Sequence, residues 1–236
     1  LPCLTMLSLE DSNISDLKPL QSLKNLEYLY LSDNQIKNVS VLSHFIKLKE
    51  LNLDGNDIED ISCFQHLVEL TSLSLDDNSV VDISSLAGME RLETLNVSGN
   101  QVEDCHALAG LLGLSELHLA NNRIKCVAPL KTLRKLHTLH LSENYITDVT
   151  PLSMLVELKE LYLCGNSISK IIPLSGLIKL RKLDLGSNGL RDITPLYTLT
   201  NLTYVRISFN EIHSIWPLIY LPKLERLLFE GNTKQL

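Results

Sequence analysis

Residues 26–34 read LEYLYLSDN, and this pattern returns every twenty-two residues along the 236-residue chain. Leu29 and Leu31 alternate with Tyr28 and Tyr30. A period of two predicts a strand with one buried face and one open face. Asn34 follows the strand, at the point where the chain must turn. The stretch therefore predicts a short strand whose leucines enter a core and whose tyrosines stay on an open surface.

Asparagine occupies the same position of every repeat except the first, where Ser12 replaces it. This ladder consists of Asn34, Asn56, Asn78, Asn100, Asn122, Asn144, Asn166, Asn188, Asn210 and Asn232. Eleven repeats, the last incomplete, begin at Leu4, Leu26, Leu48, Leu70, Leu92, Leu114, Leu136, Leu158, Leu180, Leu202 and Leu224. A fixed period of this length across residues 1–236 predicts one α/β solenoid, in which each coil contacts only its neighbours.

Each part of the consensus LxxLxLxxNxIxDIxPLxxLxx has an expected structural role. The Asn amide has two donors and a carbonyl acceptor, so we expect it to satisfy buried backbone groups of its own coil and the next. Aspartates in the slot of Asp60 and Asp148 are expected to accept from amides two or three residues on. Prolines in the slot of Pro129 and Pro151 forbid a regular sheet there, which favours 3₁₀ or single helical turns.

The consensus resembles the leucine-rich repeat family, and specifically its twenty-two-residue Sds22-like and internalin-like subclass. The resemblance extends from Leu4 to Asn232. It implies a right-handed superhelix with a parallel β-sheet on the concave face and 3₁₀ or short helical turns on the convex face. Because the repeated residues are those that build the coil, the resemblance specifies fold more strongly than function.

The chain opens on the tail of a preceding repeat, with Leu1 in the slot of Leu23 and Leu67. Terminal coils need caps over their apolar cross-section, and neither end carries an obvious one. We therefore expect a fragment of a longer chain, or a second chain that covers the ends. No stretch approaches the roughly 18 apolar residues of a membrane span.

Five scattered cysteines suggest a reducing compartment, so we expect an intracellular protein that is cytoplasmic, nuclear or associated with the cytoskeleton. Cys63, Cys105 and Cys126 fall in the outer half of their coils, where small packing residues are expected, and Cys164 projects from the open face. The net charge of −7 hides an asymmetry. Residues 1–118 contain 6 basic and 19 acidic residues, a balance of −13, and residues 119–236 contain 15 and 9, a balance of +6.

Binding residues are expected among the strand positions between the leucines and just beyond them. Three groups are predicted, all facing a protein partner, because Tyr and Arg are favoured anchors in interfaces. The N-terminal patch is Tyr28, Tyr30, Asp33, Asp54, Asp76 and Asp77. The central stack is His118, His140 and Tyr162. The C-terminal patch is Tyr204, Arg206, Phe209 and Arg226. Trp216 lies apart, on the outer side, and is expected to pack under a C-terminal segment or to contact a partner.

No pattern in the sequence predicts chemistry. His137 and His140 spell HxxH near His118, but no third metal ligand can be assigned, so no metal site is predicted. Glycines such as Gly99 precede the ladder Asn and serve the turn, so no phosphate loop and no cofactor are expected. A net charge of −7 and dispersed basic residues argue against nucleic-acid binding. We therefore expect a protein that is not an enzyme.

The leading functional prediction is a scaffold that holds a folded protein on its concave face. The resemblance to Sds22 suggests the catalytic subunit of a serine/threonine phosphatase as one candidate partner. A second hypothesis is a structural spacer or assembly module of a large ciliary or centrosomal protein. A third is a bacterial adhesin or effector similar to internalins.

Overall fold

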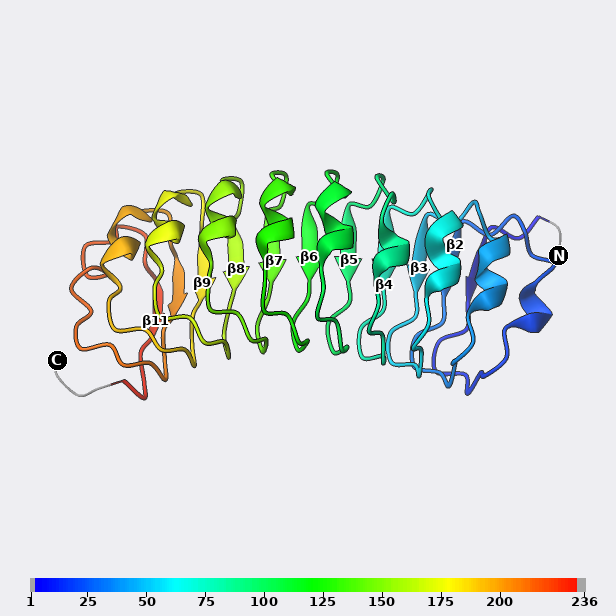
Figure 1. Cartoon of the computed structure of the whole chain (residues 1–236), viewed down its shortest axis with the longest axis horizontal. Helices are drawn as coiled ribbons and strands as arrows, with labels where there is room; N and C mark the ends of the chain where they lie inside the picture. Colours follow the sequence, from blue (N-terminus) through cyan, green and yellow to red (C-terminus); the bar gives the residue numbers. More distant parts are fainter. Residues whose placement is uncertain (1–2, 233–236) are drawn as a thin grey trace.

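Every coil contributes one three-residue strand, and the eleven strands form a single parallel sheet in chain order (Figure 1). The computed structural model describes residues 3–232. Residues 1–2 and 233–236, on which the prediction of a fragment partly rests, lie outside this range. The strands are β1 (Met6–Ser8), β2 (Tyr28–Tyr30), β3 (Glu50–Asn52), β4 (Ser72–Ser74), β5 (Thr94–Asn96), β6 (Glu116–His118), β7 (Thr138–His140), β8 (Glu160–Tyr162), β9 (Lys182–Asp184), β10 (Tyr204–Arg206) and β11 (Arg226–Leu228).

Strand register follows the repeat length without a slip. Leu29 of β2 pairs with Leu51 of β3, and Tyr28 and Tyr30 pair with Glu50 and Asn52. The same offset of twenty-two residues holds between all ten neighbouring pairs of strands. Equivalent residues of successive coils therefore lie side by side in rows across the sheet.

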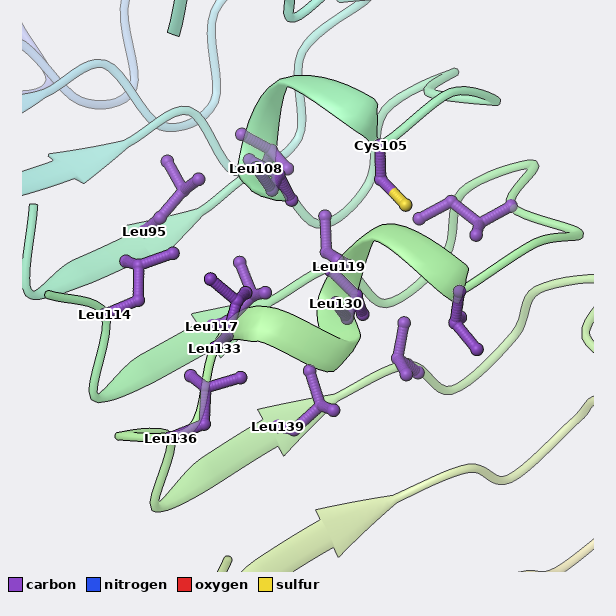
Figure 2. Packing of buried hydrophobic residues seen from close by; sticks show 14 of the residues in the cluster. Leu95, Cys105, Leu108, Leu114, Leu117, Leu119, Leu130, Leu133, Leu136 and Leu139 are labelled. Atoms are coloured by element: carbon purple, nitrogen blue, oxygen red, sulfur yellow. The ribbon is translucent and has the colours of Figure 1, made fainter. Parts of the chain in front are cut away.

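The leucine rows form one continuous core between the strands and the outer turns. Leu95, Leu117 and Leu139 point inward from successive strands, while Leu108 and Leu130 meet them from the opposite side (Figure 2). All five side chains are fully buried. Burial of a leucine contributes about 1.5–3 kcal/mol, so these rows supply most of the cohesion between coils.

In the first nine coils the outer side is a short 3₁₀ helix, as the proline and aspartate slots predicted. The Asp148 carboxylate accepts a hydrogen bond from the Thr150 amide at 2.8 Å, and Asp60 does the same for Ser62. The turn at residues 216–220 does not become a 3₁₀ helix. The 3₁₀ helices are η1 (Lys18–Leu20), η2 (Ser40–His44), η3 (Ser62–His66), η4 (Ser84–Leu86), η5 (His106–Gly110), η6 (Ala128–Thr132), η7 (Thr150–Met154), η8 (Ile172–Gly176) and η9 (Thr194–Thr198). The predicted solenoid is confirmed, with the sheet on its concave side and the 3₁₀ helices on its convex side.

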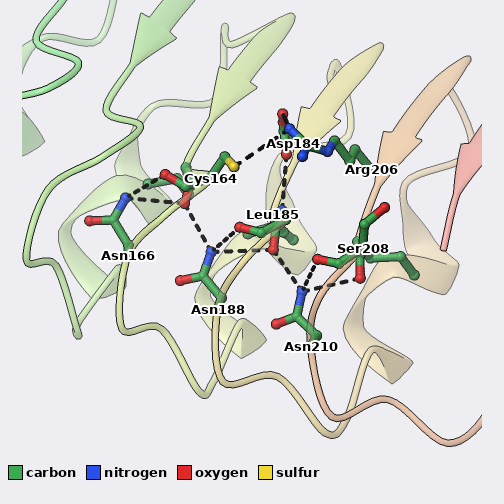
Figure 3. Close-up of polar contacts among 11 residues, drawn as sticks. Cys164, Asn166, Asp184, Leu185, Asn188, Arg206, Ser208 and Asn210 are labelled. Atoms are coloured by element: carbon green, nitrogen blue, oxygen red, sulfur yellow. Dashed lines mark hydrogen bonds and ion pairs between the residues drawn. The ribbon is translucent and has the colours of Figure 1, made fainter. Parts of the chain in front are cut away.

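The ladder asparagines join each coil to the one before it. The Asn188 amide donates to the carbonyls of Leu185 and Gly186 in its own coil and to Leu163 in the preceding coil (Figure 3). Its carbonyl accepts from the Ile168 amide of that same preceding coil at 2.9 Å. All ten ladder residues accept the equivalent bond. The predicted satisfaction of backbone groups is therefore confirmed, but the second coil served is the preceding one rather than the next.

Candidate functional site

The predicted binding residues divide into strand residues and rim residues. Eight lie on strands at positions that alternate with inward-facing leucine or valine, buried in every case except the partly buried Leu227 of β11. Their side chains occupy one open surface, here called the sheet face: Tyr28, Tyr30, His118, His140, Tyr162, Tyr204, Arg206 and Arg226. The other five follow the ends of strands and form a rim along one edge: Asp33, Asp54, Asp76, Asp77 and Phe209.

The central stack is an array of three rings on neighbouring strands. The His118 and His140 ring centroids lie 4.3 Å apart, and those of His140 and Tyr162 lie 4.1 Å apart, both in stacked geometry. The strand pairing of β6, β7 and β8 places the three residues opposite one another. A glutamate contacts each end of the stack. Tyr162 Oη donates to Glu160 Oε2 at 2.7 Å, and His118 Nε2 lies 2.8 Å from Glu116 Oε1.

The middle ring of the stack is held neutral at physiological pH. Burial, followed by the neighbouring His118, lowers the pKa of His140 to about 4. Burial and the hydrogen bond to Glu160 both raise the pKa of Tyr162. The stack therefore offers a partner a flat, partly buried aromatic surface in the middle of the sheet face, with an uncharged ring at its centre.

Carboxylates lie beside Tyr30 and along the rim of the N-terminal patch. Tyr30 Oη donates to Glu50 Oε2 at 2.8 Å, and this bond, with burial, raises the pKa of Tyr30 to about 12. Asp54 accepts from the Ser74 hydroxyl at 2.6 Å and from the Asp76 amide at 2.7 Å. Burial and the nearby Asp77 and Asp54 carboxylates raise the pKa of Asp76. This part of the surface is therefore an aromatic centre among closely spaced negative charges.

The rim residues immediately before the ladder Asn adopt a left-handed backbone conformation. Asp33, Asp77 and Phe209 have φ of 56°, 48° and 56°. Each leans over the glycine at the same position of the next coil: a Cβ added at Gly99 would clash with the Asp77 carboxylate, and one at Gly231 would clash with the Phe209 ring. Glycine at these positions lets the larger side chain lie along the rim.

Arginines in the C-terminal patch are engaged by residues of the sheet itself. Arg206 Nη1 lies 3.3 Å from Asp184 Oδ2 and 3.6 Å from Cys164 Sγ (Figure 3). Arg226 lies over the Tyr204 ring, 5.7 Å from its centroid, in a cation–π arrangement. Phe209 remains 55% exposed beside them. The patch is thus less basic than its sequence suggested, because Asp184 offsets the charge of Arg206.

Four carboxylates that fix the predicted side chains were not among the predicted binding residues. They are Glu50, Glu116, Glu160 and Asp184, the partners of Tyr30, His118, Tyr162 and Arg206. All four occupy strand positions on the sheet face, so their placement was readable from the repeat. The partner of each carboxylate could not be predicted from the repeat, because it depends on the rotamer that a long side chain adopts.

The remaining candidate features lie outside the sheet face or lack convergent groups. Trp216 is 51% exposed beside Ile219 and Tyr220 in the turn at residues 216–220. Cys105 is buried and Cys63 is partly buried, but Cys126 is exposed, so the prediction that it packs inside is wrong. Its position is the one that aspartates such as Asp148 occupy elsewhere, and that position faces solvent.

Within residues 3–232, no group of three or more His, Cys, Asp and Glu side chains is arranged to hold a metal ion. His118 and His140 stack face to face instead of converging on one point. Burial raises the pKa of Cys63, Cys105 and Cys164, which disfavours a thiolate nucleophile at these positions. Over the same residues, no helix has the length and apolar character needed to traverse a bilayer.

Comparison with known protein families assigns most of the chain to one repeat type. The family described as Leucine Rich repeats (2 copies) matches residues 2–44, 24–66, 68–110, 113–154 and 156–198. A comparison with curated proteins gives no match.

Solved structures similar to this one include bacterial and plant repeat proteins. An internalin of Listeria monocytogenes, InlF, is 33% identical with a TM-score of 0.95, over 98% of this chain and 68% of that one. Internalin C2 of the same organism is 35% identical with a TM-score of 0.73, over 75% and 78%. The plant peptide hormone receptor RGFR1, in complex with RGF2, is 26% identical with a TM-score of 0.86, over 99% of this chain and 41% of that one.

The family match covers well over half of the chain, and the InlF identity extends over nearly all of it. Both agree with the coil geometry, the parallel sheet and the asparagine ladder. This chain belongs to the leucine-rich repeat family.

Proposed function

We propose that this chain is a non-catalytic binding module that holds a folded protein partner against its sheet face. The observation that supports it most is that buried and exposed strand positions of each coil carry different residue types. Leucines at fixed positions are fully buried, while the intervening strand positions carry Tyr, His and Arg side chains on one continuous surface. A fold held together by its leucines does not require aromatic side chains on its open face.

The dimensions of the sheet suit a protein interface. Eleven parallel strands about 4.8 Å apart extend over roughly 50 Å, and five residues per coil give a width of about 17 Å. The resulting area is on the order of the 800 Å² per partner that stable complexes bury. The sheet face is therefore large enough for one folded domain.

Rigid anchors on this face favour affinity. The stacking of His140 between His118 and Tyr162, and the hydrogen bond from Tyr30 to Glu50, restrict these rings before any partner arrives. Side chains that are already ordered lose less conformational entropy on binding. Tyrosine and arginine are also the residue types enriched among binding hot spots.

Affinity purification from a lysate of the source cells tests the proposal. The variant Tyr28→Ala/Tyr30→Ala/Arg206→Ala removes three sheet-face anchors. A matched control, Tyr145→Ala/Tyr197→Ala/Arg134→Ala, removes the same residue types from exposed positions outside the strands. We expect the sheet-face variant alone to lose a partner. An unchanged set of partners would instead favour the spacer hypothesis.

A second candidate is an internalin-like binding module, favoured by the 33% identity to InlF over 98% of this chain. The prediction of an intracellular location rests on the five free cysteines and is tested by cell fractionation. The phosphatase partner suggested by the resemblance to Sds22 remains the most specific form of the proposal. Pull-down of a purified serine/threonine phosphatase catalytic subunit by the wild-type chain tests it directly, and lack of binding would remove that partner.

A further inference from the structure

Four of the five open positions of the first eight coils contain carboxylates but no lysine or arginine. The second position holds two lysines, Lys49, which pairs with Glu27, and Lys159. At the third, fifth, seventh and eighth positions of the first eight coils, between Met6 and Gly165, no Lys or Arg occurs. The same positions contain ten carboxylates, here called the acidic strip: Glu10, Asp11, Asp33, Glu50, Asp54, Asp76, Asp77, Glu116, Glu143 and Glu160. These carboxylates come from seven of the first eight coils, since the coil of β5 contributes none.

Contacts within residues 3–232 leave most of this charge uncompensated. Two of the ten carboxylates form ion pairs in this range, Glu116 with His118 and Glu160 with Lys182. Glu10 and Glu50, in contrast, accept hydrogen bonds from the neutral hydroxyls of Ser32 and Tyr30. Neutral donors orient a carboxylate but leave its charge in place. A cationic partner would therefore gain attraction along the strip.

The other end of the same sheet shows which cation suits such a surface. There Arg206 pairs with the Asp184 carboxylate, and Arg226 lies over the Tyr204 ring. The first eight coils offer the same two elements, the carboxylates of the acidic strip and the tyrosines of β2, without an arginine at these positions. The guanidinium group is suited to both, because it binds carboxylates in a planar fork and stacks on aromatic faces.

We infer that the acidic strip docks a basic protein surface whose arginines lie against Tyr28, Tyr30 and the neighbouring carboxylates. The inference rests on the proposed function and specifies the chemistry of its partner. The net charge of residues 1–118, which is −13, gives these coils a negative electrostatic potential that agrees with the inference. Such a field accelerates the approach of a cationic partner and orients it toward the N-terminal coils.

A defined probe tests the inference without knowledge of the natural partner. The probe is a fluorescent dodecapeptide of alternating arginine and serine, with lysine and glutamate versions for comparison, measured by anisotropy at low salt. The sheet-face variant is Glu50→Gln/Asp54→Asn/Asp76→Asn, which keeps the hydrogen-bond acceptors and removes three charges. The control variant Glu59→Gln/Glu90→Gln/Glu103→Gln removes three charges from exposed positions outside the sheet face.

We expect the arginine peptide to bind more tightly than the lysine peptide, and the glutamate peptide not to bind. The sheet-face variant should weaken arginine-peptide binding about tenfold, and the control variant less than about twofold. An equal loss in both variants, equal affinity for the arginine and lysine peptides, or no binding would overturn the inference. A natural partner that is lost from the Tyr28→Ala/Tyr30→Ala/Arg206→Ala variant but presents an acidic contact surface would overturn it too, while the proposed function would stand.

Discussion

The side chain of Asn122 contacts four backbone groups at hydrogen-bond distance, its two N–H groups being shared among three carbonyls, and replacement by alanine removes all four contacts. Its carbonyl accepts from the Val102 amide at 2.9 Å, and its amide donates to the carbonyls of Val97, Leu119 and Ala120. Each of these carbonyls keeps a second donor, which is Asn100, Asn144 and the Gly99 amide respectively. The Val102 amide is buried and has no second acceptor among the described residues.

Asn122→Ala therefore leaves the buried Val102 N–H group without an acceptor. The three carbonyls each lose one of two donors and stay hydrogen-bonded through the other. An orphaned buried donor costs about 1–3 kcal/mol, so we expect the free energy of unfolding to fall by that amount. Urea denaturation followed by circular dichroism measures it. The control is Asn121→Gly, next in sequence but exposed and at a φ of 53° that glycine adopts without strain. A loss below about 0.5 kcal/mol for Asn122→Ala, or an equal loss in the control, would refute the reasoning.

Three further predictions concern the sheet face and its rim. The pKa of His140 is lowered from 6.5 to about 4, so the unfolded chain takes up a proton at a higher pH than the folded chain does. The unfolding free energy of the wild type should therefore fall relative to that of His140→Gln as the pH drops from 6.5 to about 4. Urea denaturation at several pH values measures the difference. Glu50→Gln should lower the pKa of Tyr30 from about 12, which ultraviolet titration of tyrosine detects. Gly99→Ala, at φ 63° and against Asp77, should cost roughly 1–3 kcal/mol of unfolding free energy, whereas Gly110→Ala, with open space around its Cβ, should not.

Results against these three predictions are equally definite. Parallel pH profiles for wild type and His140→Gln would mean that the pKa of His140 is not lowered in the folded chain. An unchanged tyrosine titration in Glu50→Gln would mean that the Tyr30 hydrogen bond does not form in solution. Equal stability of the two glycine variants would contradict the left-handed rim conformation.

The sequence predicted the coil well because one short pattern repeats with little variation. Alternation of Leu29 and Leu31 with Tyr28 and Tyr30 specified which side chains enter the core, and the constant spacing specified strand register. The direction of the asparagine ladder was harder to predict. Asn34 lies between two coils, and only the geometry of the turn places its carbonyl near Ile14 of the preceding coil.

Side-chain pairing on the sheet face could not be predicted from the repeat. Rows of neighbours were evident, so the stack of His118, His140 and Tyr162 followed from register alone. Arg206, however, could reach several groups, and the structure shows it on Asp184 and Cys164. Long side chains have many rotamers of similar energy, and the choice among them depends on local burial and charge.

Site-specific photo-crosslinking tests the central claim, that the sheet face is the partner-binding surface, most directly. The photoreactive amino acid p-benzoylphenylalanine replaces either Thr138, on the open face of β7, or Met154, at the end of η7 in the same coil. Both positions are accessible to solvent, and the strands and 3₁₀ helices to which they belong lie on opposite sides of the coil (Figure 1). The account predicts a crosslinked partner from position 138 and none from position 154. A partner crosslinked at position 154 but not at position 138 would contradict it.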